Sequence, residues 1–199
     1  KKQQYFCKNC NKRFLDFYTY QAYRFGIDND IVALTKEGTG VRSTARLLKI
    51  SPTTLLARII TIAKNIVQPY KKKKKIYQVD EMRTYVKRKD KHIWIVYALE
   101  KQTKNVVCFN IGRRTNQTLK KVITGLELSE AEKIITDKLK NYKFLIRPEI
   151  HSTKFRGINH IERKNLTLRT HLKRLNRKTI CFSKSLVILN AILKIYFWG

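Results

Sequence analysis

The spacing of hydrophobic residues divides the chain into a helical part and a part of mixed strands and helices. Between residues 26 and 70, apolar residues recur at helical spacing in three short stretches, 27–34, 44–48 and 54–62. The pair Ser51-Pro52 is typical of an N-cap followed by a first-turn proline, so the third helix should begin there. A short second helix, a tight turn and a third helix are typical of a helix-turn-helix, and a plain three-helix packing unit is the alternative.

Beyond residue 75 the pattern predicts strands first and helices later. Residues 77–86, 93–99 and 106–111 are rich in β-branched and aromatic residues, which predicts three consecutive strands in a meander. Helical spacing over 115–126, a short apolar run at 134–136 and a periodic stretch over 161–175 follow, the last with its leucines on one stripe. Strand, strand, strand, helix, strand, helix is the order of a ribonuclease-H-like core with a mixed sheet. The predicted fold class is therefore α+β and multidomain.

The charge balance changes the picture by pointing to a partner. The chain has 44 Lys and Arg against 14 Asp and Glu, a formal net charge of +30. A field of that sign concentrates polyanions, so nucleic acid is the expected partner. No apolar stretch approaches about 18 residues, so a membrane is not expected. The lysine run 71–75 is expected to stay solvated as a linker that also touches phosphates.

The cysteines indicate the cellular compartment, and the first residue indicates whether the sequence begins at its natural start. The four cysteines lack the spacing of a secreted disulfide framework, which favours a reducing cytoplasm. Cys108 and Cys181 are expected to be small, buried apolar side chains. The chain opens with Lys1 rather than Met, and we expect residues to precede it.

Acidic residues are scarce, so their placement is informative. Asp80 interrupts the first strand of the mixed part and Asp137 ends the fourth, positions that are unfavourable unless a cation neutralises the charge. Glu162 begins a polar line on the helix of 161–175, opposite the leucines. In the predicted layout these three carboxylates can converge on two Mg²⁺ or Mn²⁺ ions, which would polarise a phosphodiester. The alternative is that they are surface acids beside local Lys and Arg. Glu81 should point to the opposite side of the strand and take no part.

Several stretches carry a resemblance to a known family. They are Val79-Asp80-Glu81-Met82, Gly112-Arg113-Arg114-Thr115, Thr136-Asp137 with Tyr142, and, at greatest length, residues 161–185. At these residues the chain resembles the transposases of bacterial insertion sequence 1, a branch of the DDE enzymes. The family's three catalytic acids fall on Asp80, Asp137 and Glu162. Its amino-terminal zinc ribbon and helix-turn-helix are similar to residues 5–10 and 40–46.

The chain also departs from the family pattern. Arg83 and Leu139 stand where the family usually has Trp, which bears on local packing, DNA contacts and activity. The family's first cysteine pair is absent, so Cys7 and Cys10 are half of a four-ligand site. Because two thiolates do not hold structural zinc, Zn²⁺ is expected only if upstream ligands are restored.

The resemblance implies a domain organisation along the chain. It predicts a partial zinc-ribbon-like segment (1–25), a helix-turn-helix DNA-binding domain (26–70), a basic linker (71–75) and a ribonuclease-H-like DDE catalytic domain (76–199). The residues expected to contact DNA are Arg42, Arg46, Thr53, Thr54 and Arg58 in the head, and Lys164, Arg169 and Lys173 on the helix that carries Glu162.

The implied function is DNA transposition. The protein would bind the terminal inverted repeats of its element, then cleave and transfer DNA strands with metal ions, acting as at least a dimer on DNA. The expected location is the bacterial cytoplasm, at the nucleoid. The alternative is a non-enzymatic DNA-binding transcriptional regulator derived from a decayed transposase.

Overall fold

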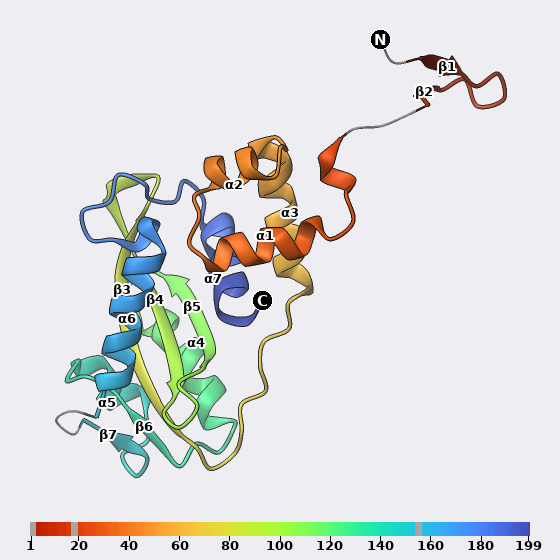
Figure 1. The fold of residues 1–199 in the computed structure, drawn as a ribbon. Coiled ribbons are helices and arrows are strands. Elements are labelled where there is room, and N and C mark those ends of the chain that lie inside the picture. The colour runs from red at the N-terminus through yellow and green to blue at the C-terminus, as the bar shows by residue number, and fades with distance from the viewer. Residues whose placement is uncertain (1–2, 17–19, 154–156) are drawn as a thin grey trace.

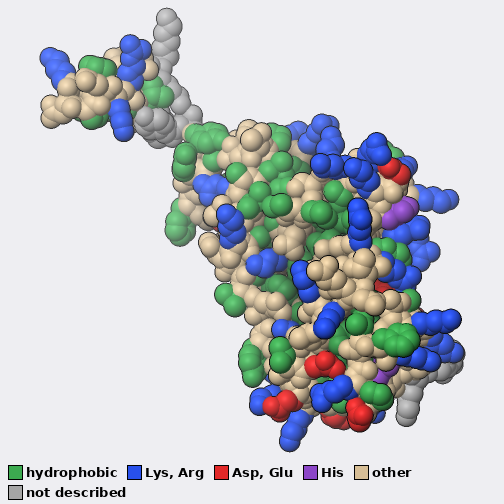
Figure 2. All heavy atoms as spheres, turned by 180° about the vertical axis from the view of Figure 1, so that it is seen from behind, with side chains coloured by type: hydrophobic (Ala, Val, Ile, Leu, Met, Phe, Trp, Pro, Cys, Tyr) green, Lys and Arg blue, Asp and Glu red, His purple; other side chains and the backbone are tan. Residues whose placement is uncertain are grey.

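The computed structural model describes residues 3–16, 20–153 and 157–199 and has a mixed α+β fold (Figure 1). Its elements in chain order are β1 (Gln4–Phe6), β2 (Arg13–Leu15), the 3-10 helix η1 (Gln21–Tyr23), α1 (Ile27–Lys36), α2 (Val41–Leu47), α3 (Pro52–Asn65), β3 (Ile76–Val86), β4 (Arg88–Glu100), β5 (Val106–Gly112), α4 (Asn116–Glu127), β6 (Lys133–Ile135), α5 (Lys140–Leu145), β7 (His151–Ser152), α6 (Asn159–His171), the 3-10 helix η2 (Lys173–Leu175) and α7 (Leu186–Trp198). The hairpin of β1 and β2 lies apart from the remaining elements (Figures 1 and 2).

The three predicted helices of the head are present. Helix α3 begins at Pro52, and the Ser51 hydroxyl accepts a hydrogen bond from the Thr54 amide at 3.0 Å, which caps the helix. The apolar side chains Ile31, Leu55 and Ile59 are buried where α1, α2 and α3 meet. The sequence pattern therefore located these helices to within a few residues.

The sheet has the predicted meander and the predicted neighbours. Its strand order is β5-β4-β3-β6-β7, with β3, β4 and β5 antiparallel and β3, β6 and β7 parallel. The fourth predicted strand thus lies beside the first. Strand β7 and helix α5 were not predicted, because each is too short to show a hydrophobic period.

Both faces of the sheet are covered by helices. On one face, Tyr77 and Val79 of β3 pack with the apolar stripe of α4 and with Tyr142 of α5. On the other face, Met82 and Val86 belong to a cluster that contains the leucines of α6 and the apolar residues of α7. Because side chains alternate between the two faces along β3, this strand contributes residues to two separate hydrophobic cores.

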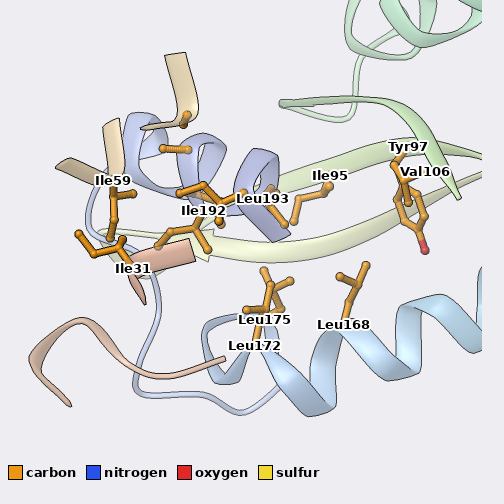
Figure 3. Close-up of a cluster of buried hydrophobic side chains, with 14 of the residues drawn as sticks. Ile31, Ile59, Ile95, Tyr97, Val106, Leu168, Leu172, Leu175, Ile192 and Leu193 are labelled. Atoms are coloured by element: carbon orange, nitrogen blue, oxygen red, sulfur yellow. The ribbon is translucent and has the colours of Figure 1, made fainter. Parts of the chain in front are cut away.

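Helix α7 joins the head to the sheet through one continuous hydrophobic cluster. It packs against α1 and α3 on one side and β5 on the other. In Figure 3, Ile192 lies toward Ile31 and Ile59 of the head, and Leu193 lies toward Ile95 of β4. A helix buried on several sides needs apolar residues all round, which is why its sequence showed no polar face.

Helix α6 is shorter than its periodic sequence predicted. The prediction of one helix over 161–175 is wrong at its end, because α6 stops at His171 and η2 follows. The His171 carbonyl lies against Gly38, where an added Cβ would be 2.1 Å from that oxygen. Leu168, Leu172 and Leu175 are nevertheless all buried on the sheet side, as the stripe predicted (Figure 3).

The lysine run makes hydrogen bonds and an ion pair with the part of the molecule that contains the sheet. The Lys74 amide donates to the Glu130 carbonyl at 3.0 Å, and the Glu132 amide donates to the Lys75 carbonyl at 3.0 Å. The Lys73 ammonium pairs with the Glu130 carboxylate at 2.8 Å. The backbone of the run is therefore hydrogen-bonded, while most of its side chains stay in solvent.

Two further expectations concern cysteines and membranes. Cys108 is buried as expected, but the expectation for Cys181 is wrong, because it is exposed in the irregular segment between η2 and α7. Among the helices that the structure describes, none has the length and hydropathy of a membrane span.

We expect Leu193→Ala to destabilise head and sheet together by about 2 to 5 kcal/mol, because Leu193 is fully buried in the shared cluster. The measurement is chemical unfolding followed by far-UV circular dichroism and by tryptophan fluorescence. The control is Val187→Ala on the same helix, which is 59% exposed and should change stability by less than about 0.5 kcal/mol. Two separate transitions, with only one shifted by Leu193→Ala, would contradict the shared core.

Candidate active site

Two of the predicted acids meet at the parallel pairing of β3 and β6. The register joins Gln78 to Ile135, the last residue of β6, so Asp80 lies two residues further along β3 and Asp137 lies two residues past the end of β6. Asp80 Oδ1 accepts from the Glu81 amide at 2.7 Å, and Asp80 Oδ2 accepts from Asn165 Nδ2 at 2.6 Å. Asp137 Oδ1 accepts from the Leu139 amide at 3.0 Å. Both carboxylates are therefore held in fixed orientations.

A third carboxylate joins them, and it is not the predicted one. One oxygen each of Asp80, Glu81 and Asp137 lies within 4.8 Å of the other two. Across the described residues, no other three His, Cys, Asp or Glu side chains are grouped in this way. Alternation correctly placed Glu81 on the opposite face of β3, beside Tyr142, but its side chain still reaches the group. The adjacency of Glu81 to Asp80 was the only signal in the sequence.

The residues around Glu81 compensate the negative charge of its carboxylate poorly. Its side chain is 1% exposed, and Oε2 lies 3.6 Å from Arg114 Nη2. Its Oε1 has no hydrogen-bond partner within the described structure, and neither has the buried Tyr142 hydroxyl. Arg114 is itself positioned by stacking on Trp94, with the guanidinium carbon 4.5 Å from the ring centroid.

Burial and mutual repulsion raise the pKa values of two of these acids. Burial raises the pKa of Asp80 to about 6, and the charges of Asp137 and Glu162 add to this. Burial raises the pKa of Glu81 to about 7; Asp137 adds to this, while Arg114 opposes it. The sheet thus concentrates negative charge where only one cationic side chain compensates it, which suits a divalent cation.

Glu162 lies outside the compact group but borders the same groove. It is exposed in the first turn of α6, where the sequence placed it. Asp80, Glu81 and Glu162 all line a groove of about 1090 Å³. The structure therefore brings Asp80 and Asp137 together directly and sets Glu162 at the rim.

Polar contacts fasten α6 to the sheet and so fix where Glu162 stands. The Gln78 side chain donates to the Gly157 carbonyl and accepts from the Ile161 amide at 3.0 Å. The buried Tyr97 hydroxyl is shared between Asn165 Oδ1 at 2.9 Å and the Ile161 carbonyl at 3.1 Å. Since Asn165 also donates to Asp80, it links the helix to the catalytic candidate.

The basic residues predicted on α6 are only partly in the groove. Arg169 and Lys173 line it, together with Arg177 and Lys178 from the segment after η2, which the sequence did not single out. Arg169 donates to the Leu175 carbonyl at 2.7 Å, which holds that segment in place. Lys164 is half-buried on α6 and is not among the groove-lining residues.

In the head, three of the predicted DNA contacts are exposed and two are engaged internally. Arg42, Arg46 and Thr53 are exposed on α2 and α3. Thr54 shares a hydrogen bond of 2.7 Å with the Tyr20 hydroxyl. Arg58 pairs with Asp28 at 2.8 Å and also donates to the Ala22 carbonyl, so it holds the helices together.

Cys7 and Cys10 lie at the turn of the amino-terminal hairpin. The Cys7 amide donates to the Lys12 carbonyl at 2.9 Å, and a backbone hydrogen bond from Cys10 lowers the pKa of the Cys7 thiol. In the parts of the chain that the structure covers, no third metal-ligating side chain joins this pair.

Two protein families and several known proteins are similar to this chain. The family described as IS1 transposase matches residues 75–198, and the one described as InsA C-terminal domain matches residues 18–65. The insertion element iso-IS1n protein InsB of Shigella dysenteriae is 35% identical over 113 residues, which cover 57% of this chain and 86% of that protein. The insertion element IS1 protein InsB of Shigella flexneri is 34% identical over 119 residues, covering 60% of this chain and 91% of that protein.

A third relative and one solved structure are also similar. The insertion element IS1 2 protein InsB of Escherichia coli K12 is 36% identical over 108 residues, covering 54% of this chain and 65% of that protein. A chain from the cryo-EM structure of the simian T-cell lymphotropic virus intasome in complex with the PP2A regulatory subunit B56 gamma has a TM-score of 0.42 and 16% identity. It covers 82% of this chain and 66% of that chain, a likeness too weak to assign a fold.

We expect the metal-free protein to lose stability as pH rises from about 5 to about 8, seen as a fall of several degrees in Tm in EDTA. The folded-state pKa values of Asp80 and Glu81 are raised to about 6 and about 7, so the stability they contribute is complete below their ordinary values. This contribution to stability is lost as pH rises through the raised pKa values of the folded state. The double variant Asp80→Asn with Glu81→Gln should flatten this profile, and an unchanged slope would show that other groups cause it.

Proposed function

We propose that this chain, which belongs to the IS1 transposase family, cleaves the ends of its insertion element and joins them to target DNA. The observation that carries the proposal is the meeting of Asp80 on β3 and Asp137 just past the end of the parallel strand β6, with Glu162 lining a groove that also contains Asp80. We take these three as the catalytic carboxylates. The strand order and the packing of α6 on β3 support a ribonuclease-H-like catalytic domain over 76–199.

The residues of the site fit a divalent cation. Three carboxylate oxygens lie within 4.8 Å of one another, and a buried Glu81 oxygen has no partner in the described structure. Asp80 and Asp137 would hold Mg²⁺ or Mn²⁺ from two adjacent strands, with Glu162 as the third catalytic ligand from the groove side. When bound, such ions polarise the phosphodiester and stabilise the negative charge that develops during its displacement.

The chain's own residues perform the remaining tasks. Asn165 and the Glu81 amide orient the two oxygens of Asp80, so the carboxylate needs no rearrangement during the reaction. Arg169 and Lys173 line the groove beside Glu162 and would hold backbone phosphates of the DNA strand. A water or a DNA 3′ hydroxyl would then attack the phosphorus and displace the 3′ oxygen of the scissile bond, which leaves as a 3′ hydroxyl, without a covalent enzyme intermediate.

The head would select the DNA. Its exposed residues Arg42, Arg46 and Thr53 lie on the second and third helices of a three-helix unit, as in a helix-turn-helix whose third helix enters the major groove. We propose that this unit recognises the terminal inverted repeats. Because two element ends must be held together, at least two copies would act on DNA. The domain division at residues 25, 70 and 75 is part of this proposal.

Asp80→Asn, Asp137→Asn and Glu162→Gln should each fold and bind DNA but lose cleavage and strand transfer by at least about two orders of magnitude. The assay is nicking and joining of labelled element-end DNA with Mg²⁺ or Mn²⁺. The matched control is Glu149→Gln, an exposed acid shortly before α6, which should stay active. An active Glu162→Gln with an inactive Glu149→Gln would move the third carboxylate to Glu149. Wild-type DNA binding without cleavage under any divalent ion would favour the regulator.

Replacing Arg42 and Arg46 together by Ala should weaken binding of element-end DNA and reduce the salt slope by about one per residue, because each would contact a phosphate or base. Binding is measured by fluorescence anisotropy across salt concentrations. The control is Arg88→Ala, an exposed arginine at the start of β4 that is paired with Asp90. If the double variant loses no more affinity per removed charge than Arg88→Ala, the head has no special role in binding.

A further inference from the structure

Two glutamates of the sheet are buried, and they differ in the residues that surround them. Counting backbone and side chain together, Glu81 on β3 is 9% exposed and Glu100 on β4 is 5% exposed. Each has an Oε1 without a hydrogen-bond partner in the described structure. Glu100 accepts a hydrogen bond from the Thr103 hydroxyl at 3.1 Å and belongs to no group of acids. Glu81 instead lies within 4.8 Å of two other carboxylates. Burial alone therefore does not explain the position of Glu81.

The single arginine near Glu81 does not balance this charge. Arg114 is 3.6 Å from Oε2, at the outer edge of an ion pair, and its side chain is 39% exposed. It faces three carboxylates that carry up to three negative charges. A buried carboxylate without full compensation is unfavourable, and a divalent cation among the three oxygens would remove most of that penalty.

The oxygens of the two acids already assigned to the site are partly committed. Asp80 accepts a hydrogen bond on each oxygen, and Asp137 accepts one on Oδ1. Glu81 Oε1 is shielded from solvent and accepts no hydrogen bond in the described structure. Burial raises the pKa of Glu81, and the Tyr142 hydroxyl, a donor beside this carboxylate that also has no hydrogen-bond partner there, opposes the rise. Like Asp137 Oδ2, Glu81 Oε1 is an oxygen of this group for which the described structure gives no hydrogen bond. Because Glu81 projects from the other face of β3, it would approach a cation held between Asp80 and Asp137 from the face opposite to Asp80.

We propose that Glu81 is a direct ligand of the divalent cation held by Asp80 and Asp137. The inner site then consists of two carboxylates from β3 and one from the residues just after β6, and Glu162 contributes from the groove. Arg114, stacked on Trp94, is the cationic neighbour of Glu81 Oε2 at 3.6 Å, whereas Oε1 accepts no hydrogen bond in the described structure. This inference rests on the proposed function, since it concerns the same cation.

The test is the affinity of the full chain for Mn²⁺ alone, measured by calorimetry or by electron paramagnetic resonance without DNA. Glu81→Gln removes the charge, and Glu81→Asp keeps the charge but withdraws the carboxylate by one methylene. If Glu81 is a direct ligand, both variants should weaken Mn²⁺ binding by about tenfold or more. The matched control Glu100→Gln should bind Mn²⁺ like the wild type.

The two Glu81 variants separate ligation from a long-range charge effect. Wild-type affinity in Glu81→Asp, whatever Glu81→Gln does, would overturn the proposal, because only the charge would then matter. Thermal unfolding in EDTA reports folding, and Glu81→Gln should be at least as stable as the wild type because a buried carboxylate is removed.

Asp80→Asn and Asp137→Asn distinguish this inference from the proposed function. If they weaken Mn²⁺ binding while both Glu81 variants do not, Glu81 is no ligand and the proposed function stands. If they too leave Mn²⁺ binding unchanged, the cation site itself is wrong.

Discussion

The parallel pairing of β3 with β6 places two carboxylates, Asp80 and Asp137, next to each other in a sheet that helices cover on both faces. Charges in such a place are desolvated, and the pKa of Asp80 rises accordingly. The net charge of +30 does not relieve this, because nearly all of that charge is solvated and screened within about 10 Å. Groups in contact have the larger effect, and in the described part of the chain they include Arg114, Asn165, Tyr142 and the local amides.

The packing of α6 follows from the same arrangement. Its leucines cover one face of β3, while Asn165 and the amide end of the helix satisfy Asp80 and Gln78. This leaves the polar side of α6 facing a groove that begins at the acids and continues past Arg169 and Lys173. A negative cluster that can hold cations therefore adjoins a basic surface that can hold phosphates. That combination is what phosphodiester chemistry requires.

Helix α7 gives the head a fixed place relative to this site. Its apolar residues pack on α1 and α3 and on the sheet, so one hydrophobic cluster contains Ile31 of the head and Ile95 of the sheet (Figure 3). The docked backbone of the lysine run adds a second connection. Lys and Arg side chains are spread over the face of the molecule seen in Figure 2, so a DNA bound by the head, as proposed, would continue along the same molecule.

Local sequence patterns predicted most of the helices and strands and indicated an acidic site. The Ser51 cap, the three strands and the leucine stripe are short-range patterns, and Asp80 and Asp137 were recognisable because acids in apolar strands are unfavourable. Tertiary structure alone decided the rest. Helix α7 has no polar face to reveal its partners, and α6 ends where His171 meets Gly38, far away in sequence. Alternation gave the direction of the Glu81 Cβ but not the reach of its side chain, so only the folded sheet brought its carboxylate to the other two.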